Sequence, residues 1–406
     1  MSSVDVRERA KKAEKKPSAI GPDIDLNAYS VEVKEHGKIQ KLKNLSGEVK
    51  EKAISVGVEA VEACRSGSFF QMDHSVILSS AYKSGLEVMS STEALKKYDW
   101  LQDYWWKAVN VDADKYTAQA ELKQNHGYFL RALPGAKVEF PLQACLYMTQ
   151  DGLAQNVHNI IIAEEGSELH IITGCTTAPG VRTGLHIGVS EFYVKRNAMV
   201  TFTMIHNWAE DVEVRPRTGA IVEDNGIFLS NYVCMKPVKT LQMYPTAYCV
   251  GENANVRFNT ILFAREGSNM DVGGRVFLRA KGSRAELVTR AITKGGDIVT
   301  RGHLIGEVPG IRGHLECRGL ILSEKGSIHA IPELEGKANN IDMSHEAAVG
   351  KIVEEEIQYL MARGLNSEEA TSVIVGGFLD VEIKGISEHL KREIKKAVRM
   401  GEERLL

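Results

Sequence analysis

The sequence has no long apolar run of the kind that carries a chain into or across a membrane. No stretch approaches the roughly 20 apolar residues that a membrane-spanning helix needs. The N-terminal segment MSSVDVRERAKKAEKK is rich in charge, unlike a secretory signal. We therefore expect a cytoplasmic protein with no membrane partner. The net charge of −3 also gives no reason to expect nucleic acid as a partner.

Cysteine is sparse, and the common nucleotide-binding motifs are missing. The six cysteines are scattered, and no two have CxxC spacing, which argues against a zinc finger, a dense disulfide framework and a permanently bound ferredoxin-type cluster. There is no GxxxxGK[ST] motif and no GxGxxG after a strand, so we expect neither a P-loop nor a dinucleotide fold. With 43% hydrophobic and 25% charged residues, the composition is that of an ordinary globular protein.

The first region, residues 1–125, is predicted to be a charged tail followed by helices. Helical spacing of apolar residues covers 44–66 and roughly 79–110, with Ser91 or Thr92 as a possible N-cap inside the second stretch. Aromatic residues gather at its end. They indicate either packing against the next domain or an exposed partner surface, and they are Trp100, Tyr104, Trp105 and Trp106.

The second region, residues 126–343, consists of short β-rich runs separated by similar turns. A polar turn with Gly or Asn recurs about every 30 residues. Such residues tolerate a left-handed backbone at a fixed corner. The turns are centred on Gly166, Asn197, Gly226, Asn253, Gly282 and Gly326. The period predicts a mostly β fold with a β-helix core and helical regions at both ends, and a β-sandwich is the alternative. An uncovered end coil would be a dimerisation surface.

The third region, residues 344–406, is predicted to be helical. An apolar stripe along KIVEEEIQYLMARG ends at Gly364, which supplies a helix stop. Asn366 and Glu369 then resemble a capping box that opens a second helix. The residues after Gly385 have the pattern of a charged amphipathic helix. The stripe residues are Ile352, Ile357, Leu360 and Met361.

Two neighbouring features could hold a metal. Cys317 lies in a β run with His314 and Arg318 close by in sequence, and positive groups favour the thiolate form that binds metal or accepts sulfur. The alternative is a small buried core residue. His345 and Glu346 follow, placed before the helical hairpin, where a solvated turn is the alternative. Together the three supply sulfur, nitrogen and oxygen ligands of the types that could hold iron or zinc, and the mixed set suits iron.

A second cysteine suggests sulfur chemistry. Cys175 in IITGCTTAPG falls where a strand gives way to a loop, so its thiol could be reachable as a sulfur acceptor, although a plain loop cysteine is the alternative. In MIHNWAED, His206 and Trp208 are weaker candidates, and packing is the simpler interpretation of the tryptophan.

From about residue 74 to about 380 the sequence resembles the SufB/SufD family, the scaffold subunits of the SUF iron–sulfur cluster assembly system. The order and spacing of several segments carry the resemblance. The segments are KVEFPLQA, IIIAEEGSELHIITGC, IHNWAEDVEVRP, LECRGLIL, SHEAAVGKIVEEEIQYLMARGL and EEATSVIVGGFL. The resemblance implies a right-handed parallel β-helix and a scaffold, not an enzyme, on which a transient cluster forms for transfer to acceptor proteins.

The resemblance also implies partners and site residues. A SufC-type ABC ATPase would supply ATP hydrolysis and dock on the C-terminal helices through Ile357, Leu360 and Met361. A homodimer or heterodimer would form through the C-terminal ends of two β-helices, with the cluster at the junction. The implied cluster ligands are Cys317, Glu346 (both as in SufB) and His345 (as in SufD). The implied sulfur route begins at the acceptor Cys175 and includes His206 and Trp208.

Some positions depart from the family. His206 stands where SufB often has glutamine, Pro216 where a path lysine would be, with Arg215 and Arg217 on either side. The first path positions fall on Tyr147 and Thr149, and Met343 stands where SufD can carry cysteine. The pairing of Cys317 with His345 and Glu346 is closer to SufB. The alternatives are a SufD-like partner without a cluster and a β-helix enzyme acting on polysaccharide.

Overall fold

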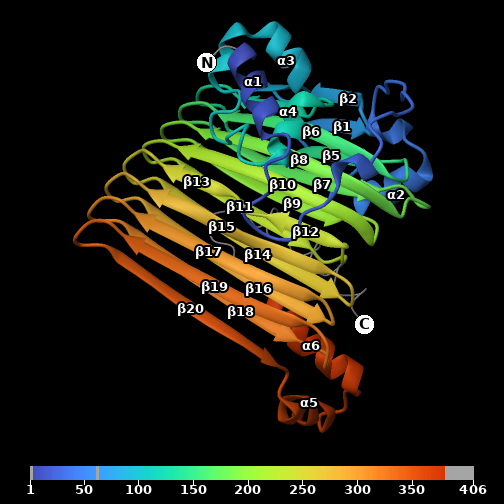
Figure 1. Cartoon of the computed structure of the whole chain (residues 1–406), viewed down its shortest axis with the longest axis vertical. Helices are drawn as coiled ribbons and strands as arrows, with labels where there is room; N and C mark the ends of the chain where they lie inside the picture. The colour runs from blue at the N-terminus through green and yellow to red at the C-terminus, as the bar shows by residue number, and fades with distance from the viewer. Residues whose placement is uncertain (1–2, 61–63, 380–406) are drawn as a thin grey trace.

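The computed structural model describes residues 3–60 and 64–379, and its centre is a stack of parallel strands arranged in two sheets (Figure 1). Sheet 1 consists, in spatial order, of β2 (Ser75–Ala81), β1 (Gly67–Met72), β5 (Leu142–Met148), β7 (Glu168–Thr177), β9 (Met199–Asn207), β11 (Ile227–Cys234), β14 (Asn255–Arg265), β16 (Arg284–Lys294), β18 (Arg312–Ile321) and β20 (Asp342–Lys351). Sheet 2 consists of β19 (Ser327–Gly336), β17 (Asp297–Gly306), β15 (Asn269–Leu278), β12 (Thr240–Met243), β10 (Asp211–Val222), β8 (Thr183–Val194), β6 (Leu153–Ala163), β4 (Tyr128–Ala132) and β3 (Leu86–Ser90), with β13 (Thr246–Cys249) paired to β10 and β15.

The chain passes from one sheet to the other at every turn of this solenoid, which has about 8 turns. The inward-facing side chains of both sheets form one continuous apolar core. Each strand contributes alternate residues to it, as Ile171 of β7 and its register partner Phe202 of β9 show. The predicted parallel β-helix with helices at both ends is confirmed.

The corners repeat because each holds a residue with positive φ. Asn197, Asn225 and Asn253 have φ of 57°, 53° and 57°, and their side-chain amides form a ladder in which Asn225 donates to Asn197 and Asn253 donates to Asn225. Gly166 and Gly282 continue the same corner. The predicted turn at Gly226 is therefore correct in place, but its left-handed residue is Asn225.

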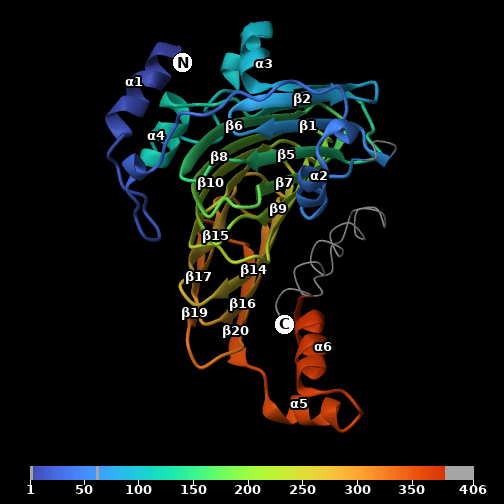
Figure 2. The same ribbon diagram turned by 90° about the vertical axis from the view of Figure 1, so that its right-hand side faces the viewer.

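Helices cover the outer faces of the sheets, α1 and α4 on one side and α2 and α6 on the other (Figure 2). The aromatic residues of 100–106 pack on sheet 2 with α1 and α4, which confirms the packing interpretation for this group. The helices are α1 (Ser3–Ala13), η1 (Leu26–Ala28), η2 (Leu42–Asn44), α2 (Gly47–Ile54), α3 (Ser91–Lys97), η4 (Asp99–Asp103), α4 (Lys115–Leu122), α5 (Glu354–Met361) and α6 (Ser367–Leu379).

Two helical predictions are wrong in part. Residues 79–90 belong to β2, its turn and β3, because these strands close the first coil by pairing antiparallel with β1 and β4. The N-cap of α3 is Ser90, in a capping box with Glu93, rather than Ser91 or Thr92. At the other end, residues 342–351 form β20, so helix begins only at Glu354.

The C-terminal hairpin matches its local signals. Asn366 and Glu369 form the predicted capping box, with the Asn366 side chain accepting from the Glu369 N–H and the Glu369 side chain accepting from the Asn366 N–H. Gly364 has φ of 102° at the end of α5. The helix predicted after Gly385 lies outside the described residues. No helix among those that are described is long and apolar enough to cross a membrane.

Candidate functional site

Cys317 lies on β18 and points into the solenoid. It is 4% exposed, and its strand neighbours alternate between buried and more exposed positions. Burial raises the pKa of the Cys317 thiol, and the positive charge of Arg290 opposes this in part. Arg318 instead faces outward and pairs with Glu316, with 2.7 Å between Nε and Oε1. The nearby positive residues of the sequence therefore do not make this thiol a resting thiolate.

His345 and Glu346 lie on β20, the strand beside β18, and not in a turn before a helix. The register pairs His345 with Leu315 and Glu346 with Glu316. Because neighbouring strands share their pleat, His345 is on the interior face with Leu315 and Cys317, whereas Glu346 is on the outer face. The strand thus separates two residues that adjacent positions in sequence seemed to bring together.

The outer face around Glu346 is a chain of ion pairs. Arg290 Nη2 lies 2.8 Å from Glu316 Oε1, and Arg318 Nη2 lies 3.8 Å from Glu346 Oε2. Arg290 also lies over the Phe378 ring of α6. Glu346 is therefore linked, through charged neighbours, to the helix that covers this face of sheet 1.

A single copy of the chain does not assemble a metal site from these residues. Among residues 3–60 and 64–379, no group of three or more His, Cys, Asp and Glu side chains is arranged to hold a metal ion. Cys317 and His345 share the interior face, whereas Glu346 lies on the other one.

The C-terminal end of the solenoid is open. Within the described part of the chain, β20 has β18 as its sole sheet neighbour, and β19 has β17. Nearly every residue of β20 is exposed, although β20 is in line with buried strands (Figure 1). A strand with an unpaired edge is a ready template for pairing with another chain. The residues nearest to this edge include His345, one strand away from Cys317.

Cys175 is not on a loop, as its sequence context suggested. Strand β7 extends through it to Thr177, and its side chain is 0% exposed in the solenoid interior. Burial raises the pKa of the Cys175 thiol well above its ordinary value. The register pairs Cys175 with His206 of β9. A sulfur atom that reaches Cys175 must therefore enter the core.

His206 and Trp208 face the same interior. Burial lowers the pKa of His206 well below its usual value. The Nδ1 atom of His206 lies 2.8 Å from the Tyr232 hydroxyl. Neither His206 Nε2 nor Trp208 Nε1, both buried, has a hydrogen-bond partner among the residues that the structure describes. Near Cys175, His206 Nε2 and Trp208 Nε1 could therefore each form one further hydrogen bond.

Of the residues at the family's other path positions, Pro216 faces the interior beside Met204 and Tyr232, but it offers no polar side chain there. Arg215 and Arg217 flank Pro216 but face outward, and Arg217 Nε donates to Asp114 at 2.8 Å. Tyr147 faces outward too, in the cluster under α2. Sequence reasoning instead missed Tyr232 and Cys234, which alternate inward on β11 and could have been found from that alternation.

The predicted ATPase-docking stripe lies on α5. Ile357 and Leu360 are half-buried, while Met361 is 43% exposed. Further apolar side chains are exposed on or next to the same hairpin, and these are Val353, Tyr359 and Val373. On α6, Ala370, Val375 and Leu379 are buried, the last two against sheet 1.

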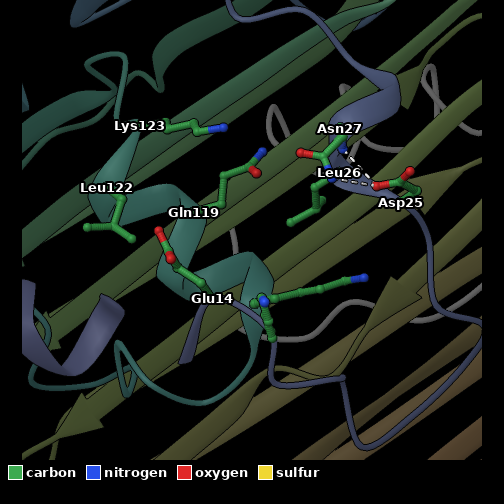
Figure 3. A pocket seen from close by; sticks show the side chains of 9 residues that line it. Glu14, Asp25, Leu26, Asn27, Gln119, Leu122 and Lys123 are labelled. Atoms are coloured by element: carbon green, nitrogen blue, oxygen red, sulfur yellow. Dashed lines mark hydrogen bonds between the residues drawn. The ribbon is translucent and has the colours of Figure 1, made fainter. Parts of the chain in front are cut away.

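A hollow of about 420 Å³ between α4 and the N-terminal segment is separate from these residues (Figure 3). Its lining carries both signs of charge, from Glu14 and Asp25 and from Lys15 and Lys123. None of the candidate sulfur or iron ligands lines it.

Comparison with known sequences shows which family the chain belongs to. The pattern described as SUF system FeS cluster assembly, SufBD core domain, matches residues 146–378. The chain belongs to the SufBD family. The match includes every candidate residue from Cys175 to Met361. Relatives named Iron-sulfur cluster assembly SufBD family protein come from Methanothermobacter thermautotrophicus, 50% identical over 98% of both chains, and from Archaeoglobus fulgidus, 52% identical over 88% of this chain and 96% of that one. The iron-sulfur cluster assembly protein SufB of Bacillus subtilis is 30% identical over 79% of this chain and 69% of its own.

Proposed function

We propose that this chain is a scaffold subunit, not an enzyme, on which an iron–sulfur cluster is assembled and then released. The observation that supports this most is the position of Cys317 one strand from an open solenoid end that carries His345. Two chains meeting at such ends would bring two sets of ligands together, which a single chain lacks. A cluster held across a junction between subunits is also one that a change at that junction can release.

Before iron binds, Cys317 would be a neutral thiol, since burial raises its pKa. Iron binding then displaces a proton, so the apparent affinity for iron should rise with pH. Glu346 starts on the outer face beside Arg318. To act as a ligand it would leave that ion pair, which is mostly solvent-exposed and so costs about 1 kcal/mol or less to break.

The partner in this proposal is a SufC-type ABC ATPase, bound at the exposed apolar surface of α5 and α6. It would supply the ATP hydrolysis, since the sequence has no P-loop. Its docking surface is tested with Met361→Asp, which places a charge on the exposed end of the stripe. We expect loss of co-purification with the ATPase, whereas Gln358→Glu on the same helix should leave it intact. Co-purification of both variants would move the interface elsewhere.

The scaffold role is tested by anaerobic reconstitution with iron and sulfide. Cys317→Ala should lose most of the iron and of the visible absorbance, and Glu346→Ala should lose part of both. Cys249→Ala, a buried cysteine of β13, is the matched control. Unchanged iron content in both test variants would remove these residues from the site.

A SufD-like subunit without a cluster of its own is the second candidate. The outward position of Glu346, and the lack of a ligand group among the described residues of one chain, favour it. Iron analysis of the chain alone, with its ATPase, and with both the ATPase and a SufB-type partner separates the two. Iron that binds when no paralogue is present supports the scaffold role. This holds for a homodimer and for a heterodimer in the cell. The polysaccharide-enzyme alternative has no support in the family to which the chain belongs.

A further inference from the structure

A second buried thiol lies on the interior face near Cys175. Cys175 is in register with His206, and one strand further along, Cys234 ends β11 at the position that continues the same register. All of these side chains are buried in the solenoid core. We propose that Cys234 is a second sulfur carrier, which receives a sulfur atom from a persulfide on Cys175. This inference rests on the proposed scaffold function, which needs sulfur delivered toward Cys317.

Distance is the first argument. Cys175 on β7 is five strands from Cys317 on β18, which at about 4.8 Å per strand is roughly 24 Å. Cys234 on β11 divides this separation into a step of roughly 10 Å and a step of roughly 16 Å, because Cys317 lies two residues from the register line of Cys234. No side chain spans the whole distance, so a carrier between the two cysteines shortens the part over which sulfur has to move without a covalent attachment.

The spacing of Cys175 and Cys234 also suits sulfur transfer better than disulfide formation. Strands two apart place their Cα atoms about 10 Å from one another, whereas a disulfide needs less than about 7 Å. The two thiols therefore cannot close into a disulfide. A persulfide on Cys175 adds an S–S bond of about 2 Å to that side chain. The distance between the two reacting sulfur atoms is therefore shorter only while Cys175 carries the sulfur to be transferred.

Tyr232 and His206 supply a route for the proton. The Tyr232 hydroxyl lies 2.8 Å from His206 Nδ1. The Cys234 thiol, two residues along the same strand, donates to the Lys236 carbonyl oxygen at 3.5 Å, and it would turn from that bond to pass its proton to the Tyr232 hydroxyl. Burial raises the pKa of Cys234 to about 12, and Tyr232 opposes this. His206 Nε2 is buried without a partner among the described residues, on the strand between the two cysteines. The cluster thus joins a thiol, a hydroxyl and an imidazole, with one ring nitrogen unused.

The step balances without an oxidant or reductant. The Cys234 sulfur attacks the terminal sulfur of the Cys175 persulfide, so an S–S bond forms on Cys234 and the S–S bond on Cys175 breaks. The electron pair of the broken bond stays on the Cys175 sulfur. The Cys234 proton passes through the Tyr232 hydroxyl to His206 Nδ1, and a proton from His206 Nε2 goes to Cys175. The first persulfide comes from a donor of sulfane sulfur.

The interior continues toward Cys317 with hydroxyl groups. Tyr232, Thr260, Thr289 and Cys317 are in register on four consecutive strands of sheet 1 and are all buried. Cys234 therefore lies beside the start of a polar line through an otherwise apolar core. The line runs from Tyr232 to the proposed cluster ligand.

The test is residue-resolved mass spectrometry of persulfides after brief anaerobic exposure of the full chain to inorganic polysulfide, a small donor of sulfane sulfur. In the unmodified chain we expect label on Cys175 first and on Cys234 later. Cys175→Ser should lower the label on Cys234 at least tenfold, and Cys234→Ser should leave the label on Cys175. Tyr232→Phe should slow transfer while Cys175 is labelled as before, which a merely structural role would not do.

Cys249→Ser is the matched control, because Cys249 is as buried as Cys234 and burial also raises its pKa to about 12. This variant should transfer sulfur as the unmodified chain does. Absence of label on Cys234, or equal label on Cys234 in the Cys175→Ser variant, would overturn the proposal. Iron loading of the unmodified chain with inorganic sulfide is measured in parallel. If the chain does not load iron, the scaffold function itself is contradicted. If it loads iron but no sulfur moves from Cys175 to Cys234, only the carrier role of Cys234 is contradicted.

Discussion

The two ends of the solenoid differ in how their last strands are treated. At the N-terminal end, β1 is almost fully buried, and β2 and β3 fold back antiparallel on it and on β4. At the C-terminal end, β19 and β20 continue the sheets but are largely exposed. The chain covers the edge strands itself at the N-terminal end. At the C-terminal end of the described part, the outer edges of β19 and β20 have no strand beside them and could pair with another chain. The difference supports the proposal that the C-terminal end is an interface.

The aromatic segment that covers sheet 2 in the N-terminal half is held by one buried carboxylate. Glu191 of β8 accepts hydrogen bonds from the backbone N–H groups of Trp106, Ala108 and Val109, at 2.6–3.0 Å. It also pairs with His158 at 2.8 Å, both side chains being fully buried. This carboxylate fixes the aromatic segment to sheet 2.

The largest effect is therefore expected from Glu191→Ala, which leaves the N–H groups buried and unpaired. We expect the free energy of unfolding to fall by about 3–5 kcal/mol in denaturant titration. At the open end, Glu335→Ala removes an exposed ion-pair partner of His303 and Lys337 and should cost no more than about 1 kcal/mol. Equal losses from the two variants would remove the contrast between the ends.

The open edge can be altered without touching the fold. The Asp342 N–H donates to Ile311, so even-numbered residues of β20 point their N–H groups toward β18 and odd-numbered ones toward the free edge. Ala347→Pro removes a free-edge N–H, and proline is tolerated there. We expect the dimer dissociation constant to rise at least tenfold in analytical ultracentrifugation, with the melting temperature unchanged.

Ala348→Pro is the matched control, since it removes an N–H that faces β18. It should lower the melting temperature, unlike its neighbour. A dimer that Ala347→Pro leaves as tight as before would show that the β20 edge is not the interface.

A smaller difference is expected between the thiols of the two regions. Burial raises the pKa of Cys317 and raises that of Cys175 further, and the thiolate is the form that alkylates. Exposed Cys64 should react first with iodoacetamide, then Cys317, then Cys175, as followed by mass spectrometry. While the pH is below the pKa of the thiol, the rates for Cys317 and Cys175 should each rise about tenfold per pH unit. Reaction of Cys175 as fast as Cys317 would contradict the closed interior.

The sequence predicted those features that depend on a few neighbouring residues. The corners follow from the left-handed preference of residues such as Asn197 and Asn253, and the cap of α6 follows from Asn366 and Glu369. Strand ends were less predictable, because pairing with distant strands sets them. Pairing with β9 extends β7 through Cys175, and pairing with β18 makes a strand of the segment around His345.

That pairing also decides which residues share a site. Local sequence put His345 and Glu346 together, but a strand sends neighbours to opposite faces. Strand pairing likewise brings Cys234 beside His206, which is 28 residues earlier in the chain. The same interval of 28 residues separates Asn225 from Asn197. The interior cluster is therefore visible only once the register is known.

The most direct test of a cluster shared between two chains is the iron content of the Ala347→Pro variant after anaerobic reconstitution, measured together with its sedimentation. Ala347 offers no ligand atom but is the register partner of Cys317, so a loss of iron is assigned to the junction only where the variant also sediments as a monomer. We expect folded monomers with little bound iron, beside an unmodified chain that is dimeric and loaded. Monomers that hold as much iron and absorb as strongly as the unmodified chain would contradict a site built between two subunits.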